Sequence, residues 1–191
     1  ITTRVEIDHR MADLLAGEAT VAIRAGQGVW PGLRADHLMR ATYTPMVSRA
    51  FVERHGPLRS PEDLLSVPRL DADDPDWALW FRAAGVMPPP ATARRASSLG
   101  IQVLDAQAVM AGHGAGILTP VYFREALRRG ELIQPFDIVA EGTLSIWLVY
   151  PERRRNAPAI RAFRNWLLDE MRALGARPEE GPAEGVRSSS S

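Results

Sequence analysis

Short apolar runs alternate with stretches of helical periodicity along most of the chain, and this alternation constrains the fold more than any other feature. The apolar runs predict strands at 20–23, 38–47, 67–70, 91–98, 115–118 and 143–150. Stretches with helical spacing separate them. Strands that alternate with helices favour an α/β fold with mainly parallel sheets.

Proline, glycine and small polar residues mark where the helices begin and end. Asp74-Pro75 opens a helix that Gly85 ends, and Ser60-Pro61 opens a shorter one. One later helix ends at residues 112–114 and presents an apolar stripe of Ile101, Leu104, Ala108 and Ala111. The last helix starts at Asn156 and carries Ile160, Phe163, Trp166, Leu167 and Met171 at helical spacing.

Two long strands indicate an organisation in two lobes. The strands near 43–47 and 145–150 hold few turn residues, so each is long enough to cross from one lobe to the other. Residues 46–147 between them contain their own set of strands and helices. Pro45 has no N–H to donate, and we expect regular strand pairing to end there.

Composition excludes several kinds of chemistry. The 191 residues hold 23 basic and 23 acidic side chains; every basic one is arginine, and there is no cysteine. Lysine Schiff bases, thiolate nucleophiles and sulfur-bound metals are therefore excluded. The zero net charge argues against a protein that coats nucleic acid. No apolar run approaches the roughly 20 residues that span a bilayer, so we expect a cytoplasmic protein without a membrane partner, and a disordered tail from residue 176.

No motif for catalysis or for metal binding stands out. No HExxH or HxH motif occurs at any of the four histidines. The acidic run of residues 71–74 suits a metal or a helix-capping loop, and capping is the favoured interpretation. The glycines of residues 112–116 end a helix instead of opening one after a strand, which is the wrong order for a phosphate loop. We expect no metal, no cofactor and no enzymatic activity.

Two places favour the binding of a small anion. Ser97, Ser98 and Leu99 form a turn just before a helix, where free N–H groups and the helix dipole attract a carboxylate; a plain helix cap is the alternative. Arg24 follows a short strand and can pair with a carboxylate, or form a structural salt bridge. Trp30, in a Trp-Pro-Gly turn, is either a loop anchor or a wall of the ligand site.

Several sequence blocks resemble one known family. Residues 22–33 read AIRAGQGVWPGL, which is similar to a motif of LysR-type transcriptional regulators, in the subgroup resembling the glycine-cleavage activator. Further blocks follow in the family's order: PMVS at 45–48, PEDL at 61–64, AGHGAGI at 111–117, GELIQPF at 130–136 and AFRNWL at 162–167. Together they cover about residues 1–173.

The resemblance implies an effector-binding domain shaped like a type 2 periplasmic binding protein, with a small molecule bound between two lobes. Lobe 1 is expected at 1–43 plus 148–174, and lobe 2 at 44–147. The implied ligand-binding residues are Thr3, Arg24, Ser97, Ser98, Leu99 and Thr119, beside the Trp30 considered above.

The resemblance also implies partners. Family members form homodimers or homotetramers through these domains and bind DNA through an N-terminal winged helix-turn-helix. That domain is expected to be missing here, together with the first strand and helix of the effector domain. We therefore interpret the chain as the effector-sensing part of a transcription regulator, with a stand-alone solute-binding protein of the same fold as the alternative.

Overall fold

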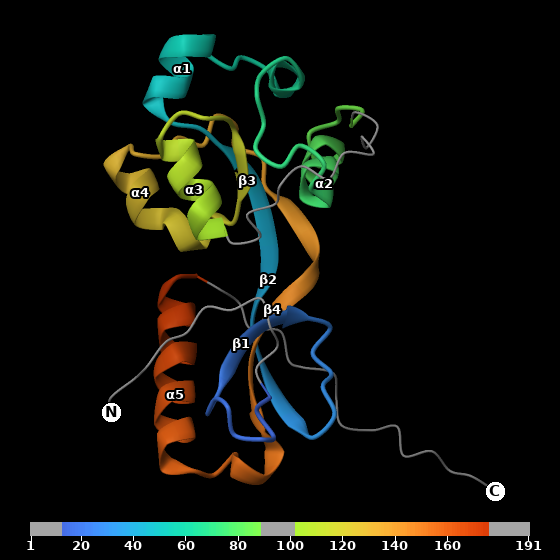
Figure 1. Ribbon diagram of the computed structural model, residues 1–191, viewed down its shortest axis with the longest axis vertical. Coiled ribbons are helices and arrows are strands. Elements are labelled where there is room, and N and C mark those ends of the chain that lie inside the picture. The colour runs from blue at the N-terminus through green and yellow to red at the C-terminus, as the bar shows by residue number, and fades with distance from the viewer. Residues whose placement is uncertain (1–12, 89–101, 176–191) are drawn as a thin grey trace, which may run out of the picture. The chain divides into compact units, whose positions relative to one another are not determined.

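The computed structural model describes residues 13–88 and 102–175, and the chain divides into two units (Figure 1). Unit 1 takes in Ile1–Ala41 and Thr143–Ser191, and unit 2 takes in Thr42–Gly142. Strands β2 (Leu33–Met46) and β4 (Ala140–Pro151) both run across the boundary between the units. The lobe boundaries expected from the sequence, after residues 43 and 147, stay predictions.

Unit 1 is built on a sheet in which β4 lies between β1 (Ala22–Gly26) and β2. β1 and β4 are antiparallel, with Ala22 opposite Val149 and Gly26 opposite Ser145. One face of the sheet buries an apolar cluster around Leu14, Trp147 and Val149. Because side chains alternate along a strand, Tyr150 lies on the opposite face of the sheet. There the Asp36 carboxylate of β2 accepts hydrogen bonds from the Tyr150 hydroxyl and from Arg164 of a long helix.

That helix is α5 (Pro158–Ala173), which stands beside the sheet of unit 1 (Figure 1). It begins at Pro158, two residues after the Asn156 start that the sequence predicted, and buries Ile160, Leu168 and Met171. The predicted apolar stripe is wrong at Trp166, whose side chain is 54% exposed and contacts the ring of Phe163. Helical spacing places apolar residues on a common side, but the width of the covered strip depends on the sheet below it.

Unit 2 is held by two apolar clusters. The first packs α1 (Arg49–His55), a 3₁₀ helix at Pro61–Leu65 and α2 (Pro75–Ala83) around Phe51, Leu64, Trp77, Trp80 and Phe81. The second packs α3 (Gln102–Met110) and α4 (Arg124–Arg129) on β3 (Gly116–Leu118). A short 3₁₀ helix, Pro120–Phe123, joins β3 to α4. β3 is antiparallel to the end of β2, with Thr44 opposite Leu118.

The expectation of mainly parallel sheets is wrong for the described residues. The pairs β1–β4 and β2–β3 are antiparallel, and residues 67–70 give a single parallel bridge, Arg69 to Ala115, in place of the predicted strand. The physical reason is the crossing of β4, which enters unit 1 from the boundary while β1 runs toward it. The alternation of predicted strands and helices along the sequence does not determine whether paired strands run parallel or antiparallel.

Two further expectations are corrected. Pro45 does not interrupt its strand, since β2 continues to Met46 with Pro45 opposite Ile117. Pro45 is the second-last residue of the strand, and the lack of a proline N–H disturbs strand pairing least near a strand end. α3 buries Ala106 and Val109, whereas Leu104 of the predicted stripe is 46% exposed. α3 is apolar on more than one side, and its contact with β3 at Gly116 selects the face.

Gly85 and Gly112 follow α2 and α3 with positive φ, as the predicted helix stops require. Gly130 follows α4 in the same way. Among the described residues, no helix combines the length and apolar character needed to cross a bilayer.

Candidate functional site

Arg24 lies in the middle of β1 and faces Trp147 of β4 across the sheet. Because residues directly opposite in an antiparallel pair share a face, the two side chains lie on the same side of unit 1. Arg24 is partly buried. The sequence predicted that this strand ends at Ile23; it continues to Gly26, so Arg24 is a strand residue and not the first residue after a strand.

The loop that follows β1 is shaped by two tryptophan rings. A Cβ added at Gly26 would lie 2.6 Å from Trp30, and a Cβ added at Gly28 would lie 2.6 Å from Trp147. Gly28 also has φ +87°, a conformation that other residues rarely adopt. Trp147 Nε1 donates a hydrogen bond to the Gly26 carbonyl at 2.9 Å. Glycine is therefore required at both positions for the rings to pack this closely.

Trp30 packs as a loop anchor. Its ring lies against Gly26 and joins the apolar cluster that contains Leu14, Trp147 and Val149. Of the two interpretations that the sequence allowed, these contacts favour the anchor. The role of Trp30 as a wall of a ligand site stays a prediction.

Thr119, in unit 2, directly follows β3 and is 2% exposed. Its backbone N–H donates to Gln102 Oε1 at 2.8 Å, and Gln102 Nε2 donates to Thr119 Oγ1 at 3.0 Å. The Gln102 amide thus joins the first residue of α3 to the end of β3. Sequence reasoning did not find Gln102; its position three residues after Leu99, at the start of the helix, was the available signal.

Four of the predicted site residues lie outside the described part of the chain: Thr3, Ser97, Ser98 and Leu99. Of the remaining three, Arg24 and Trp30 belong to unit 1 and Thr119 belongs to unit 2. Their common role in a ligand site therefore stays a prediction.

The acidic run after Leu70 caps a helix, as the sequence favoured. Asp74 is the N-cap of α2, and its side chain accepts a hydrogen bond from Asp76 N–H at 2.8 Å. Burial, and the charge of Asp74 second, raise the pKa of Asp76 to about 6, although a hydrogen bond from Tyr43 opposes the shift. Within residues 13–88 and 102–175, no group of three or more possible ligands is arranged to hold a metal ion.

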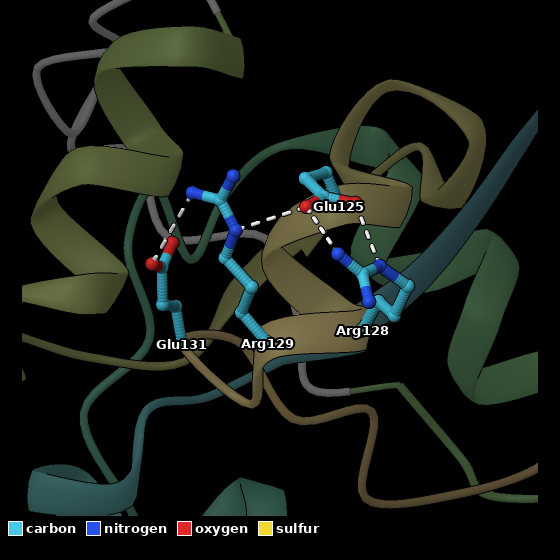
Figure 2. Close-up of polar contacts among 4 residues, drawn as sticks. All are labelled: Glu125, Arg128, Arg129 and Glu131. Atoms are coloured by element: carbon cyan, nitrogen blue, oxygen red, sulfur yellow. Dashed lines mark hydrogen bonds and ion pairs between the residues drawn. The ribbon is translucent and has the colours of Figure 1, made fainter.

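Two glutamates and two arginines form an ion cluster on α4 and the two residues that follow it (Figure 2). Glu125 accepts from Arg128 at 2.7 Å and from Arg129 at 2.9 Å, while Glu131 lies 3.8 Å from Arg129. The hydrogen bond from Arg128 is the largest cause that lowers the pKa of Glu125. Because both arginines are engaged by carboxylates of the same exposed patch, we assign the cluster a structural role.

The family model described as the LysR substrate binding domain matches residues 1–172. The chain belongs to this family. Its curated relatives include the glycine cleavage system transcriptional activator of Escherichia coli K12, 31% identical over 174 residues, which are 91% of this chain and 56% of that protein. The transcriptional activator AmpR of Pseudomonas aeruginosa PAO1 is 33% identical over 178 residues, 93% of this chain and 58% of AmpR. The chain thus spans little more than half the length of these relatives.

Solved structures agree with the family assignment. The effector domain of AmpR from Pseudomonas aeruginosa has a TM-score of 0.72 and 29% identity, over 85% of this chain and 77% of that one. The regulatory domain of CrgA from Neisseria meningitidis, at 22% identity and a TM-score of 0.65, shares the fold. The predicted fold class, an α/β fold like that of type 2 periplasmic binding proteins with two crossing strands, is confirmed for this LysR-family chain. The relatives' names give no support to the solute-binding alternative.

Proposed function

We propose that this chain is the effector-sensing domain of a LysR-type transcription regulator. It binds a small anionic or amino-acid-like molecule and performs no chemistry on it. The observation that carries the proposal is the match of residues 1–172 to the family, and the names of the relatives agree with it. In the whole regulator, DNA binding belongs to a winged helix-turn-helix, and the protein acts as a homodimer or homotetramer in the cytoplasm.

Arg24 is the proposed anchor for the effector in unit 1. Its guanidinium can make two parallel hydrogen bonds to a carboxylate. It lies on a strand whose following loop is fixed by Trp30 and Trp147, so its backbone position is well defined. Ser97 and Ser98, before α3 in the sequence, are the proposed anion ligands of unit 2, and the Gln102–Thr119 pair fixes the start of that helix.

The control of transcription is proposed to follow from a shift in population. An effector that binds one arrangement of the domain better than another increases the population of that arrangement. The coupling to DNA binding is then limited by the difference in affinity between the two arrangements.

The test is a thermal-shift screen of the whole chain against amino acids and small carboxylates, followed by titration of each hit. Arg24→Ala and Ser98→Ala are each expected to raise the dissociation constant about tenfold or more, since each removes a charged or hydrogen-bonding contact. Arg172→Ala, at the exposed end of α5, is the matched control and should bind as the parent does. A ligand that binds both site variants as tightly as the parent would place the site elsewhere.

A further inference from the structure

Ser145 of β4 stands out among the buried polar residues of the described chain. It is 9% exposed. The other buried serine and threonine residues of the described chain, Thr44, Ser48 and Thr119, all make side-chain hydrogen bonds. Within that same part of the chain, no hydrogen bond involves the Ser145 hydroxyl. A buried polar group without a partner is uncommon in a folded protein, so this hydroxyl calls for an explanation.

The residues that surround Ser145 in the sheet do not satisfy its hydroxyl. The residue directly opposite on β1 is Gly26, and the Trp30 ring occupies the space where a Cβ of Gly26 would lie. Trp147 is the next residue of β4 on the same face, and its Nε1–H already donates to the Gly26 carbonyl at 2.9 Å. Both strands therefore leave the Ser145 hydroxyl available for a further group.

Ser145 shares a face of the sheet with Arg24, the proposed anchor for the effector. Arg24 lies opposite Trp147, and Gly26 lies opposite Ser145. Residues directly opposite in an antiparallel pair share a face, and side chains alternate along each strand, so all four residues face the same side. Arg24 and Ser145 are diagonal neighbours, a relation in which residues lie roughly 7–8 Å apart. One small molecule can therefore contact both side chains.

The Ser145 hydroxyl is fixed in position and within reach of a ligand. Its Oγ atom is not one of the fully enclosed polar atoms that lack a partner, so the exposed part of the residue includes this oxygen. Gln27 Nε2 donates to the Thr143 carbonyl at 3.4 Å, which ties the loop after β1 to the first residue of β4 in unit 1. A polar group that is already held in place loses little conformational freedom when a ligand binds.

We propose that Ser145 is a second effector-binding residue of unit 1, and that the effector carries a hydroxyl or amino group beside the carboxylate that Arg24 binds. This inference rests on the proposed function, because it takes Arg24 as the carboxylate anchor. A serine hydroxyl donates one hydrogen bond and accepts two, so it can bond to either substituent. The bound substituent supplies the partner that the described residues do not provide. The site thus selects 2-hydroxy or 2-amino acids over acids that lack the substituent.

The first test needs no ligand. Removal of a hydroxyl without a partner breaks no hydrogen bond, so Ser145→Ala should melt within about 1 °C of the parent, or above it. Ser48→Ala is the matched control: its hydroxyl accepts from the Phe51 N–H as the N-cap of α1, so its melting temperature should fall by about 3 °C. A Ser145→Ala variant that melts as low as Ser48→Ala would overturn the proposal, since the hydroxyl would then have a structural partner.

The second test is isothermal titration of the whole chain with two series of matched acids: propionate, L-lactate and L-alanine, then glutarate, L-2-hydroxyglutarate and L-glutamate. In at least one series, the parent should bind a substituted acid about tenfold more tightly than the unsubstituted one, and the tighter substituent identifies the preferred chemistry. Ser145→Ala should abolish this preference and change the binding of the unsubstituted acid by less than about twofold. Ser66→Ala, at an exposed serine of unit 2, should keep the preference.

Three results of the titrations would overturn the proposal: no binding of any of these acids at about 10 mM, no preference in the parent, or a preference that Ser145→Ala retains.

Arg24→Ala separates this inference from the proposed function. It should weaken the substituted and unsubstituted acids by the same factor, because it removes the carboxylate contact that they share. If Arg24→Ala weakens binding while Ser145→Ala retains the preference, the proposed effector site stands and the role of Ser145 is wrong. If neither variant changes the binding, the proposed effector site itself lies elsewhere.

Discussion

Gln102 and Thr119 are joined by two reciprocal hydrogen bonds, one to the backbone N–H and one to the side-chain hydroxyl of Thr119. The pair connects the first residue of α3 to the residue after β3, and Thr119 is buried. The start of the helix is thereby tied to the end of the strand on which it packs.

Replacing Gln102 tests this connection. Gln102→Leu leaves the buried N–H and hydroxyl of Thr119 without their partner, so the free energy of unfolding of unit 2 should fall by about 1–3 kcal/mol. Urea unfolding followed by tryptophan fluorescence measures the change. Gln107→Leu, on the exposed side of the same helix, should change it by less than about 0.5 kcal/mol. Equal losses in both variants would contradict the role of the pair.

Gly28 and Gly17 allow backbone strain to be separated from steric conflict. Both have φ near +88°, but a Cβ at Gly17 meets nothing within 4 Å, whereas one at Gly28 lies 2.6 Å from the Trp147 ring. Gly17→Ala should destabilise unit 1 by about 1 kcal/mol, the cost of the conformation alone. Gly28→Ala should cost about 2 kcal/mol or more and shift the tryptophan fluorescence. If both substitutions lowered the free energy of unfolding equally and neither shifted the fluorescence, the Trp147 ring would be moving away from the added methyl group at no cost.

The Asp76 carboxyl makes the stability of unit 2 depend on pH. Its pKa is raised from 3.8 to about 6, mainly by burial, so the folded protein holds a proton that the unfolded protein releases between about pH 4 and 6. The free energy of unfolding should therefore fall as the pH rises through this window and become level above it.

Asp76→Asn removes that dependence while it keeps an oxygen to accept from Tyr43. Relative to the parent, the variant should gain about 1–2 kcal/mol in free energy of unfolding between pH 4 and pH 7. Asp137→Asn, an exposed aspartate of the same unit, is the control. Parallel pH profiles for the parent and Asp76→Asn would refute the assignment.

Tyr150 anchors β4 to β2 through Asp36. Its hydroxyl donates to Asp36 Oδ2 at 2.7 Å, and the residue is 3% exposed. Tyr150→Phe keeps the ring and removes the hydrogen bond, so the free energy of unfolding should fall by about 1–2 kcal/mol. The loss is measured as a lower melting temperature. Tyr122→Phe, whose residue is 51% exposed, should have no measurable effect. A neutral Tyr150→Phe would show that Arg164 alone satisfies Asp36.

Local residues were sufficient to predict much of the fold. Asp74 with Pro75 started α2, Gly112 followed the end of α3, and Pro158 stood in the first turn of α5, because caps and stops act within a few residues of themselves. The order of the motif blocks also identified the family, which the match over residues 1–172 confirms.

The roles of Arg24 and Thr119 in a ligand site stay predictions, the first made from the residues and the second from the family resemblance. The Gln102 partner of Thr119 was not predicted, because a pair 17 residues apart meets only when α3 packs on β3. The same limit applies to a pocket of unit 1 whose lining includes both Arg34 and Arg161, residues that lie far apart along the chain. Helical spacing likewise did not show that Trp166 is exposed or which face of α3 is buried.

The sequence by itself determined the start of α2, the glycine stops after α2 and α3, the α/β class and the family, because these depend on short-range backbone preferences and on the order of residues. The tertiary structure decided the antiparallel direction of β1 and β4, the tryptophan rings seated on Gly26 and Gly28, and the grouping of arginines at the start of α5. Each of these depends on which distant segments pack together. That choice is made by the burial of apolar surface across the whole chain, which local patterns do not contain.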